Sequence, residues 1–427
     1  MKKYAVLCVI SLCLAMIAAP VFANGQKEQA ASSSGNVTLT WWHNGTADPL
    51  KGVWQKVADD YHAAHPNVTI TPVPIQNEQF NTKMPLALQS NDPPDIYQQW
   101  GGGQLATQIK SGKVADITNY VSSWIGELGG SVKGWQVNGK QYGIPFDLHI
   151  VGFWYRKDLF AKAGISAPPK TMDELNADVV KLKAAGIAPI AIGSKDRWPD
   201  AFYWEYFAVR EASTAVLQKA MDTQDLSAPA FIKAGEDMQK FLDSKPFQEG
   251  FLGTPAQQGA GSSAGLVANG KAAMELQGDW DLSVMTGLTT DKDLVSKLGW
   301  FPFPQVAGGA GDPTTTLGGG DGFSVTTKNA AAGADFLKYI SSPAVQKMLV
   351  ENNIASIPVN PAATSSISNP VVQSVAAYSG AASFIQTYFD IALPTNPGQA
   401  LDSAVADFFA GQGTPQSVAE SVAKANQ

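Results

Sequence analysis

The segment VTLTWWHNGTADPLKGVWQKVADDYHAAHPNVTI, residues 37–70, contains the pattern that decides the fold class. Apolar and polar residues alternate over residues 37–41, as they do in a strand with one buried face. Apolar residues then recur at helical spacing over residues 50–61, and Pro66 ends that helix. Residues 68–70 are extended again. A strand, a helix and a strand in this order predict a β-α-β unit, whose parallel strands are covered by helices.

The same alternation continues further along the chain. A helical pattern at residues 172–185 ends at Gly186, and residues 187–192 have the pattern of a strand. We therefore predict an α/β protein. The chain of 427 residues, 44% of them hydrophobic, exceeds what one core usually supports, so two lobes are expected. Because no long linker rich in Pro, Gly or Ser divides the chain into consecutive halves, the lobes are expected to be interleaved.

The first residues have the pattern of a secretory signal. Lys2 and Lys3 precede an apolar run over residues 4–19, and residues 21–23 (Val-Phe-Ala) form a small-x-small cleavage site. We predict a signal peptide at residues 1–23 and a flexible leader at residues 24–36. The alternative is a membrane anchor, but the run is shorter than the roughly 20 apolar residues that span a bilayer.

Both cysteines, Cys8 and Cys13, lie inside the predicted signal, so the mature chain would contain neither disulfides nor thiolate metal sites. A lipoprotein needs a small residue before the lipidated cysteine, whereas Leu12 precedes Cys13. The formal net charge of −7 becomes more negative when the two lysines of the signal are removed. This charge argues against nucleic acid or anionic lipid as a partner. We expect a soluble protein outside the cytoplasm, either periplasmic or associated with the cell surface.

Several short motifs follow one another along nearly the whole mature chain. They are DPPDI (92–96), WGGG (100–103), YGIPFD (142–147), WYRKDLF (154–160), PPKTMDEL (168–175), GKAAM (270–274), GDW (278–280) and FLKYI (336–340). In this order and spacing they resemble the family 1 extracellular solute-binding proteins of ABC-type sugar importers, the group that includes maltose- and oligosaccharide-binding proteins. Arg156 departs from the family, which usually has Asn at this position.

The resemblance implies a type II periplasmic-binding-protein fold, in which two lobes are joined by hinge crossovers and close on the ligand. The first lobe would comprise residues 37–147 and 323–356. The second would comprise residues 148–322 and 357–427. Such a receptor delivers its ligand to the permease subunits of an importer, and we expect it to act as a monomer without a cofactor.

A sugar ring has apolar C–H faces surrounded by hydroxyls, so its site needs flat aromatic surfaces together with polar acceptors and donors. Ligands of open α/β sheets lie at the carboxyl ends of strands. By this rule Trp42, His43 and Asn44, which follow the first strand, are predicted to face the ligand, whereas Trp41 belongs to the core. The alternative for all three is a structural role between strand and loop.

Further candidates for ligand binding lie beside a run of glycines and at the expected crossovers between the lobes. Gln99 and Trp100 precede three glycines, although Trp100 could instead cover the core. The resemblance places Asp147 and His149 at the first crossover, where a buried aspartate could instead tie the hinge together. Asp321, near the presumed second crossover, completes this group.

Two aromatic segments complete the predicted site. Trp198 and Arg210 flank a segment whose other aromatic residues have the spacing of a helix core. Asp279 follows a segment that is extended in pattern, and it could cap a helix whose amino end points into the cleft. In related receptors a tryptophan at the position of Trp280 stacks on the sugar.

Three other chemistries are weaker interpretations. Residues 261–265 match the G-x-S-x-G elbow, but no histidine follows Ser263 as that hydrolase fold requires. A secreted glycoside hydrolase would use a pair of carboxylates, such as two from Asp147, Asp279 and Asp321. His62 and His65 could form half of a metal site, but no third ligand is evident nearby.

The sequence thus predicts a receptor rather than an enzyme, with no catalytic residue, cofactor or metal. We expect it to capture a neutral sugar, a di- or oligosaccharide, and to deliver it to the permease. A monosaccharide receptor of the same type is the alternative.

Overall fold

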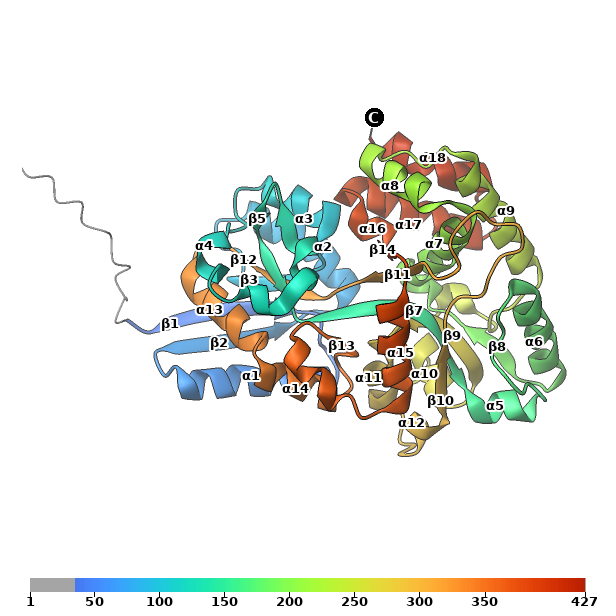
Figure 1. Cartoon of the computed structure of the whole chain (residues 1–427), viewed down its shortest axis with the longest axis horizontal. Helices are drawn as coiled ribbons and strands as arrows, with labels where there is room; N and C mark the ends of the chain where they lie inside the picture. The colour runs from blue at the N-terminus through green and yellow to red at the C-terminus, as the bar shows by residue number, and fades with distance from the viewer. Residues whose placement is uncertain (1–34, 427) are drawn as a thin grey trace, which may run out of the picture. The chain divides into compact units, whose positions relative to one another are not determined.

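The computed structural model describes residues 35–426, which lie almost wholly in the second of the chain's two units, residues 37–427. The predicted signal peptide lies outside the described residues, and so does the predicted leader up to residue 34. Within the described part, no helix combines the length and the apolar character that crossing a bilayer requires. The second unit contains two sheets with helices packed around them (Figure 1).

The first sheet begins with the predicted β-α-β unit. β1 (Val37–His43) pairs in parallel with β2 (Val68–Pro74), and α1 (Leu50–Ala64) connects them. The apolar stripe of α1 is buried at Val53, Trp54, Val57, Ala58 and Tyr61. The order of the sheet is β2-β1-β3-β12-β6, where β3 is Ile96–Gln99, β12 is Gly322–Val325 and β6 is Gly143–Pro145.

The core of the first sheet confirms the assignment of Trp41. Its side chain is fully buried, and its ring packs edge-on against Trp54, Phe323 and Phe336 at centroid distances of 5.1 Å. Phe336 comes from α13 (Ala330–Ile340), which is followed by α14 (Pro343–Glu351). A segment more than 270 residues after β1 therefore closes the core that β1 begins.

The second sheet is built on the long strand β7 (Asp147–Arg156). Its order is β14-β11-β7-β9-β8, where β14 is Ile385–Thr387, β11 is Thr316–Gly319, β9 is Ala272–Gly278 and β8 is Ala188–Ala191. β10 (Leu298–Phe301) and β13 (Ile357–Pro358) also pair with β7. β4 (Gln136–Val137) and β5 (Lys140–Gln141) form a separate hairpin.

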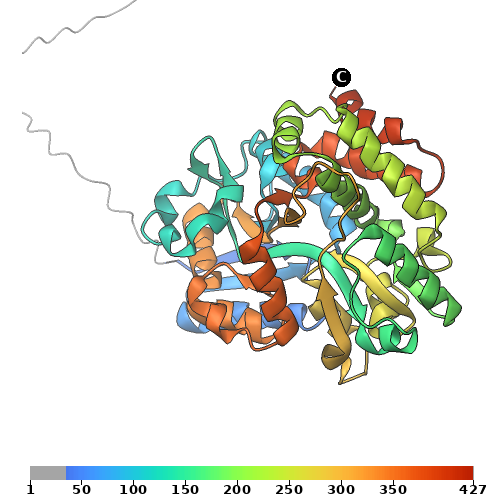
Figure 2. The same ribbon diagram turned by 45° about the vertical axis from the view of Figure 1, so that its right-hand side comes forward.

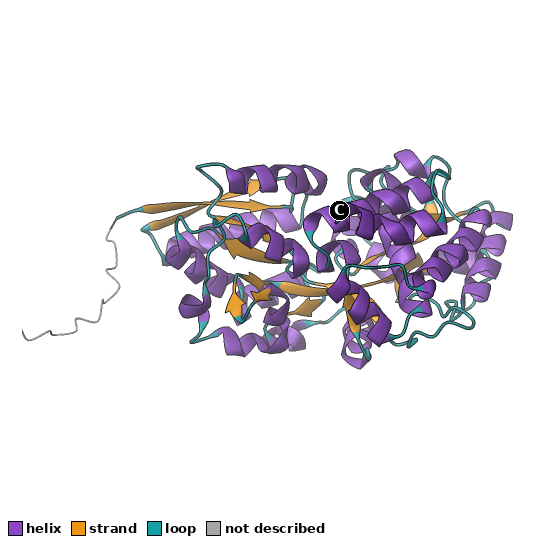
Figure 3. Cartoon of the chain, turned by 90° about the horizontal axis from the view of Figure 1, so that it is seen from above, coloured by secondary structure: helices purple, strands orange, loops and turns teal. Residues whose placement is uncertain are grey.

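Helices cover both faces of the strands (Figure 3). The predicted helix at 172–185 is α6 (Met172–Ala184), and Gly186 follows it with a φ of +70°, a conformation that favours glycine. The other α-helices are α2 (Asn77–Gln89), α3 (Gly102–Ile109), α4 (Thr118–Val121), α5 (Lys157–Lys162), α7 (Trp198–Glu211), α8 (Thr214–Thr223), α9 (Pro229–Asp243), α10 (Ser263–Ala268), α11 (Asp281–Gly287), α12 (Leu294–Lys297), α15 (Pro370–Ala381), α16 (Phe389–Ala392), α17 (Thr395–Phe409) and α18 (Pro415–Ala425). Short 3-10 segments are η1 (Ile125–Trp135), η2 (Ser194–Asp196), η3 (Phe251–Gly253) and η4 (Pro361–Ser366).

Two extended segments connect the sheets. β6 ends at Pro145 and β7 begins at Asp147, while β11 ends at Gly319 and β12 begins at Gly322. In Figure 2 the long strand β7 runs from one sheet into the other. The α/β class and the arrangement of sheets in two lobes are confirmed; the exact lobe boundaries stay a prediction. The two connections place Asp147 and Asp321 side by side.

Candidate functional site

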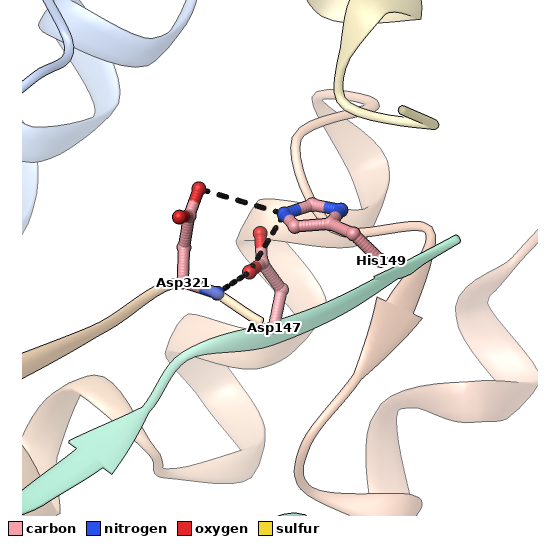
Figure 4. A group of neighbouring side chains, drawn as sticks. All are labelled: Asp147, His149 and Asp321. Atoms are coloured by element: carbon pink, nitrogen blue, oxygen red, sulfur yellow. Dashed lines mark hydrogen bonds and ion pairs between the residues drawn. The ribbon is translucent and has the colours of Figure 1, made fainter. Parts of the chain in front are cut away.

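His149 lies at the centre of a buried cluster of carboxylates. Its Nδ1 is 2.8 Å from Oδ1 of Asp279, and its Nε2 is 2.9 Å from Oδ1 of Asp147. The same Nε2 is 3.5 Å from Oδ2 of Asp321. Figure 4 shows the carboxylates of Asp147 and Asp321 approaching the same ring nitrogen. The contact with Asp147 is an ion pair rather than a well-directed hydrogen bond.

Strand register explains why these four residues meet. Asp147 and His149 are two positions apart on β7, so their side chains lie on the same face of the strand. β9 runs antiparallel to β7 with Gly278 opposite Val151, which brings Asp279 next to His149. On the other side, β11 pairs Gly319 with His149, and Asp321 follows two residues later.

Asp147 also ties the two connections between the sheets. Its Oδ1 accepts a hydrogen bond from the backbone N–H of Asp321 at 3.2 Å, and the carbonyl of Asp321 accepts one from Phe146 N–H at 2.7 Å. The structural role that was the alternative for Asp147 is therefore present. It does not remove Asp147 from the site, because its carboxylate contacts His149 as well.

Burial and charge act against each other in this cluster. Burial alone would lower the pKa of His149, but the charges of Asp147 and Asp279, together with the hydrogen bond that Asp279 accepts from the ring, raise it well above its ordinary value. Burial raises the pKa of Asp147 to about 7, although His149 opposes that shift. His149 is therefore a charged imidazolium at neutral pH. The side chain of Asp321 is 18% exposed, which makes it the member that reaches solvent.

The same side chains have donor atoms of the kind that metals accept. One atom each of Asp147, His149 and Asp321 lie within 4.8 Å of one another, the one such group of three found in residues 35–426. However, a protonated His149 has no lone pair to offer a metal. The imidazolium supplies the positive charge in this group, and we assign no metal to it.

Trp280 covers one side of the cluster. Its ring lies edge-to-face with His149 at 5.0 Å, and Tyr388 and Trp198 lie within 6.3 Å of it. A Cβ on Gly278 would lie 2.0 Å from the Trp280 ring, so a glycine at that position lets the indole fold over the end of β9. The half-buried indole thus presents a flat apolar surface beside His149, the centre of the carboxylate cluster.

Tyr388 belongs to this site, although no sequence motif marked it. Its side chain is 6% exposed, and its hydroxyl has no hydrogen-bond partner among the described residues. Its ring lies 6.2 Å from that of Trp280. Burial raises the pKa of Tyr388, and the charges of Asp279, Asp321 and Asp147 raise it further. The one sequence feature linked to Tyr388 is Gly319, because a Cβ at that position would lie 2.6 Å from the Tyr388 ring.

Trp198 joins the site from the first turn of α7 and contacts an element next to the first sheet. Its Nε1 is 3.4 Å from Oε1 of Glu78, in the first turn of α2. Burial raises the pKa of Glu78, and the charge of Asp196 adds to this effect. Trp198 also packs against Phe202, which lies 6.3 Å from Trp280. The Trp198–Glu78 contact thus joins α7 to α2, and aromatic and acidic side chains meet there.

A model of the bacterial extracellular solute-binding protein family matches residues 47–347 of this chain, more than half of its length. The chain belongs to this family. A curated relative from Pyrococcus horikoshii, an uncharacterized ABC transporter extracellular-binding protein, is 28% identical over 56% of this chain. The match covers 54% of that relative, so it spans about half the length of that protein.

Two further similarities cover more of the chain. The multiple sugar-binding protein of Streptococcus mutans is 24% identical over 81% of this chain and 80% of its own length. A solved structure from work on xylan utilization by Caldanaerobius polysaccharolyticus has a TM-score of 0.82 and 28% identity. It covers 91% of this chain and 99% of the other. The predicted family and the predicted fold are therefore confirmed.

In this member of the extracellular solute-binding family, the residues at the end of β1 and just after it divide between core and surface. His43 is buried, its ring lies 5.0 Å from that of Trp41, and its Nδ1 accepts a hydrogen bond from Gly45 N–H at 3.2 Å. Burial lowers the pKa of His43 to about 3, so it is neutral. Trp42 and Asn44 are half-buried and stay candidates. His43 instead belongs to the packing beneath them and does not face a ligand as predicted.

The side chain of Gln99 stabilises the turn that follows it. Its Oε1 accepts hydrogen bonds from the backbone N–H groups of Trp100 at 2.5 Å and Gly101 at 2.6 Å, and its Nε2 donates to Gln108 at 2.7 Å. Because both polar atoms of the Gln99 side chain form hydrogen bonds within this loop, Gln99 is not among the candidate ligand-binding residues, contrary to the sequence prediction. Trp100 is half-buried and packs edge-on against Phe80 at 5.7 Å, so it stays a candidate at the border of core and site.

Arg210 lies away from the carboxylate cluster. Its guanidinium donates to the carbonyls of Thr315 at 2.7 Å, Phe303 at 2.9 Å and Pro304 at 3.3 Å. It also packs over the rings of Tyr206 and Phe303. Because its donors are directed at a loop of the second lobe, we remove Arg210 from the candidate site.

Asp279 does not cap a helix, as the sequence pattern suggested it could. α11 begins at Asp281, Trp280 occupies the N-cap position, and no side chain there makes a cap hydrogen bond. The Oδ1 of Asp279 instead accepts hydrogen bonds from His149 Nδ1 and from Ile150 N–H at 3.2 Å. The residue keeps its place in the site with a different role, which is to orient His149.

Proposed function

We propose that this protein is the extracytoplasmic solute-binding component of an ABC importer and that it binds a neutral di- or oligosaccharide at the Trp280 site. One observation carries the proposal: the half-buried indole of Trp280 packs edge-to-face against His149, the residue that contacts the carboxylates of Asp279, Asp147 and Asp321. A sugar ring can stack its apolar face on the indole while its hydroxyls donate to the carboxylates.

Several features support a ligand of more than one ring. Trp198 and Tyr388 extend the aromatic surface around Trp280, and Trp42 and Trp100 are half-buried near the ends of β1 and β3. Each additional ring of an oligosaccharide can use a further platform. The names of the Streptococcus relative and of the Caldanaerobius work, which concern sugars and xylan, point in the same direction.

Delivery to a membrane permease follows from the architecture of the family. Two sheets joined by β7 and by residues 319–322 can rotate about these connections and enclose a ligand. A ligand that contacts both lobes binds the closed form better and therefore shifts the equilibrium toward it. We propose that the closed, monomeric receptor outside the cytoplasm docks on two permease subunits.

The geometry supports capture rather than catalysis. Asp147 and Asp279 are engaged by His149 on opposite ring nitrogens, which leaves Asp321 as the exposed carboxylate of the cluster. A glycosidase needs two carboxyl groups that both reach the bond, whereas the side chains of Asp147 and Asp279 are buried and Asp321 is the member of this cluster that reaches solvent. Ser262 and Ser263, which lie in the G-x-S-x-G segment at residues 261–265, form hydrogen bonds at the start of α10. Incubation with oligosaccharides should release no reducing ends, and turnover would contradict this part.

A calorimetric panel tests the proposed function. Neutral monosaccharides, disaccharides and oligosaccharides are titrated into the mature protein beside a peptide and a polyamine. We expect at least one di- or oligosaccharide to bind, and more tightly than the monosaccharides. Tight binding of the peptide or the polyamine without binding of any sugar would overturn the proposal.

A further inference from the structure

The charged groups around Trp280 are unbalanced. Three carboxylates, from Asp147, Asp279 and Asp321, share the single imidazole of His149, and Glu78 adds a fourth carboxylate beside Trp198. Within residues 35–426, His149 is the basic side chain that forms an ion pair with this cluster. Even with Asp147 about half protonated at pH 7, the carboxylates outnumber the one imidazolium, so the site carries a net negative charge.

Neither Arg210 nor Arg197 compensates for this charge. Arg210 directs its guanidinium at three backbone carbonyls. Arg197 precedes Trp198 in the chain, but its Nη1 donates to Ser403 Oγ at 3.1 Å. A ligand carrying a carboxylate would thus enter a site of the same charge, without the guanidinium fork that usually binds such a group.

Two buried polar atoms of the site lack partners, which indicates that a ligand completes it. The Oδ2 of Asp279 and the hydroxyl of Tyr388 form no hydrogen bond with any described residue, and both side chains are more than nine-tenths buried. Buried polar groups of this kind are normally satisfied by protein, water or ligand. The hydroxyl of Tyr388 can donate to or accept from a sugar hydroxyl, and a carboxylate oxygen can only accept.

We propose that the site selects sugars by charge: an amine-bearing sugar binds more tightly than its hydroxyl counterpart, and a uronic acid is rejected. This inference rests on the proposed function. A protonated amine donates a charge-assisted hydrogen bond to Asp321, which is the carboxylate that reaches solvent. A uronate instead places a like charge near three carboxylates, and such a juxtaposition is costly in a water-poor site.

The test compares matched ligands by calorimetry at pH 7 with EDTA present, so that a divalent cation does not contribute. The probes are glucose, galactose, mannose and the β-1,4-linked glucose disaccharide, each beside its 2-amino form and its uronic acid form. Within a series that binds, we expect about tenfold tighter binding of the amine than of the hydroxyl sugar and no measurable binding of the uronate.

Variants then locate the effect. In Asp321→Asn, which keeps an acceptor oxygen but loses the charge, the ratio of amine to hydroxyl affinity should fall toward one. Asp59→Asn, at an exposed position of α1, is the control and should leave the ratio unchanged.

Three results would overturn the inference. The first is an amine that binds no tighter than the hydroxyl sugar in every series that binds. The second is a uronate that binds as well as the neutral sugar. The third is a wider panel in which a neutral sugar binds while no amine-bearing sugar does. Binding of no sugar at all would instead refute the proposed function itself.

Discussion

His149 places its Nδ1 2.8 Å from Oδ1 of Asp279, a residue 130 positions later in the chain. The contact joins β7 to the end of β9, and the opposite nitrogen of the same ring approaches Asp147 and Asp321. One imidazolium thus stabilises carboxylates from three separate segments. The site and the connections between the sheets are held by the same side chain.

Replacing His149 by Gln should strongly destabilise the protein, because it leaves buried carboxylates without their cation. Breaking a buried ion pair in this way costs about 3–5 kcal/mol. We expect the unfolding free energy, determined by urea titration, to fall by this amount. His62→Gln, at an exposed position, is the control and should change stability by less than about 1 kcal/mol. Adding Asp279→Asn to His149→Gln should recover part of the loss. Equal stability of His149→Gln and wild type would contradict this role.

Neutral, buried His43 predicts a pH dependence of stability. Burial lowers its pKa to about 3, whereas a histidine of the unfolded chain has a pKa near 6.5. As the pH falls below about 6.5, the unfolded chain takes up this proton first, so the stability from neutral His43 is lost between about pH 6.5 and 3. Wild type should therefore lose about 2 kcal/mol more than His43→Gln between pH 7 and 5. Parallel losses in both proteins would show that His43 is not the responsible group.

Arg210 separates a structural role from a binding role. Arg210→Met leaves three carbonyls of the second lobe without their donor, so the unfolding free energy should fall by about 3 kcal/mol. Sugar affinity should stay within about twofold of wild type, since the guanidinium does not face the cluster. A variant of normal stability with strongly weakened sugar binding would return Arg210 to the site.

The hydroxyl of Tyr388 should matter for the ligand and not for the fold. Because it has no partner among the described residues, Tyr388→Phe should change the unfolding free energy by less than about 0.5 kcal/mol. Calorimetry should show roughly fivefold to tenfold weaker sugar binding, because one hydrogen bond to the sugar is lost. Tyr203→Phe is a matched control, since Tyr203 is fully buried in the core of the second lobe. Identical affinities of wild type and Tyr388→Phe would exclude the contact.

Local patterns predicted the elements well because periodicity reports burial directly. The alternation at residues 37–41 is β1, the stripe at residues 50–61 is buried on α1, and the fully buried ring of Trp41 is core. The resemblance also directed attention to Asp147, His149 and Asp321, which the structure brings together.

The roles of other residues could not be read from local pattern, because they depend on register between distant strands. Asp279 has the spacing of a helix cap, but α11 starts one residue later than such a cap requires, and antiparallel pairing with β7 directs its carboxylate to His149. Gln99 and Arg210 carry polar groups typical of binding sites, yet backbone groups nearby in space use them. Tyr388 reaches the site only through tertiary packing against Gly319.

The most direct test is calorimetry of the tightest-binding sugar with wild type, Trp280→Ala and Trp300→Ala. Trp300 is another half-buried tryptophan, which lies on β10 and packs against Tyr378, and it serves as the control. If sugar stacks on Trp280, its removal should weaken binding by about tenfold or more while the urea midpoint changes little, and Trp300→Ala should bind normally. Unchanged affinity of Trp280→Ala, together with a large loss of stability, would assign this ring to the core and contradict the proposed site.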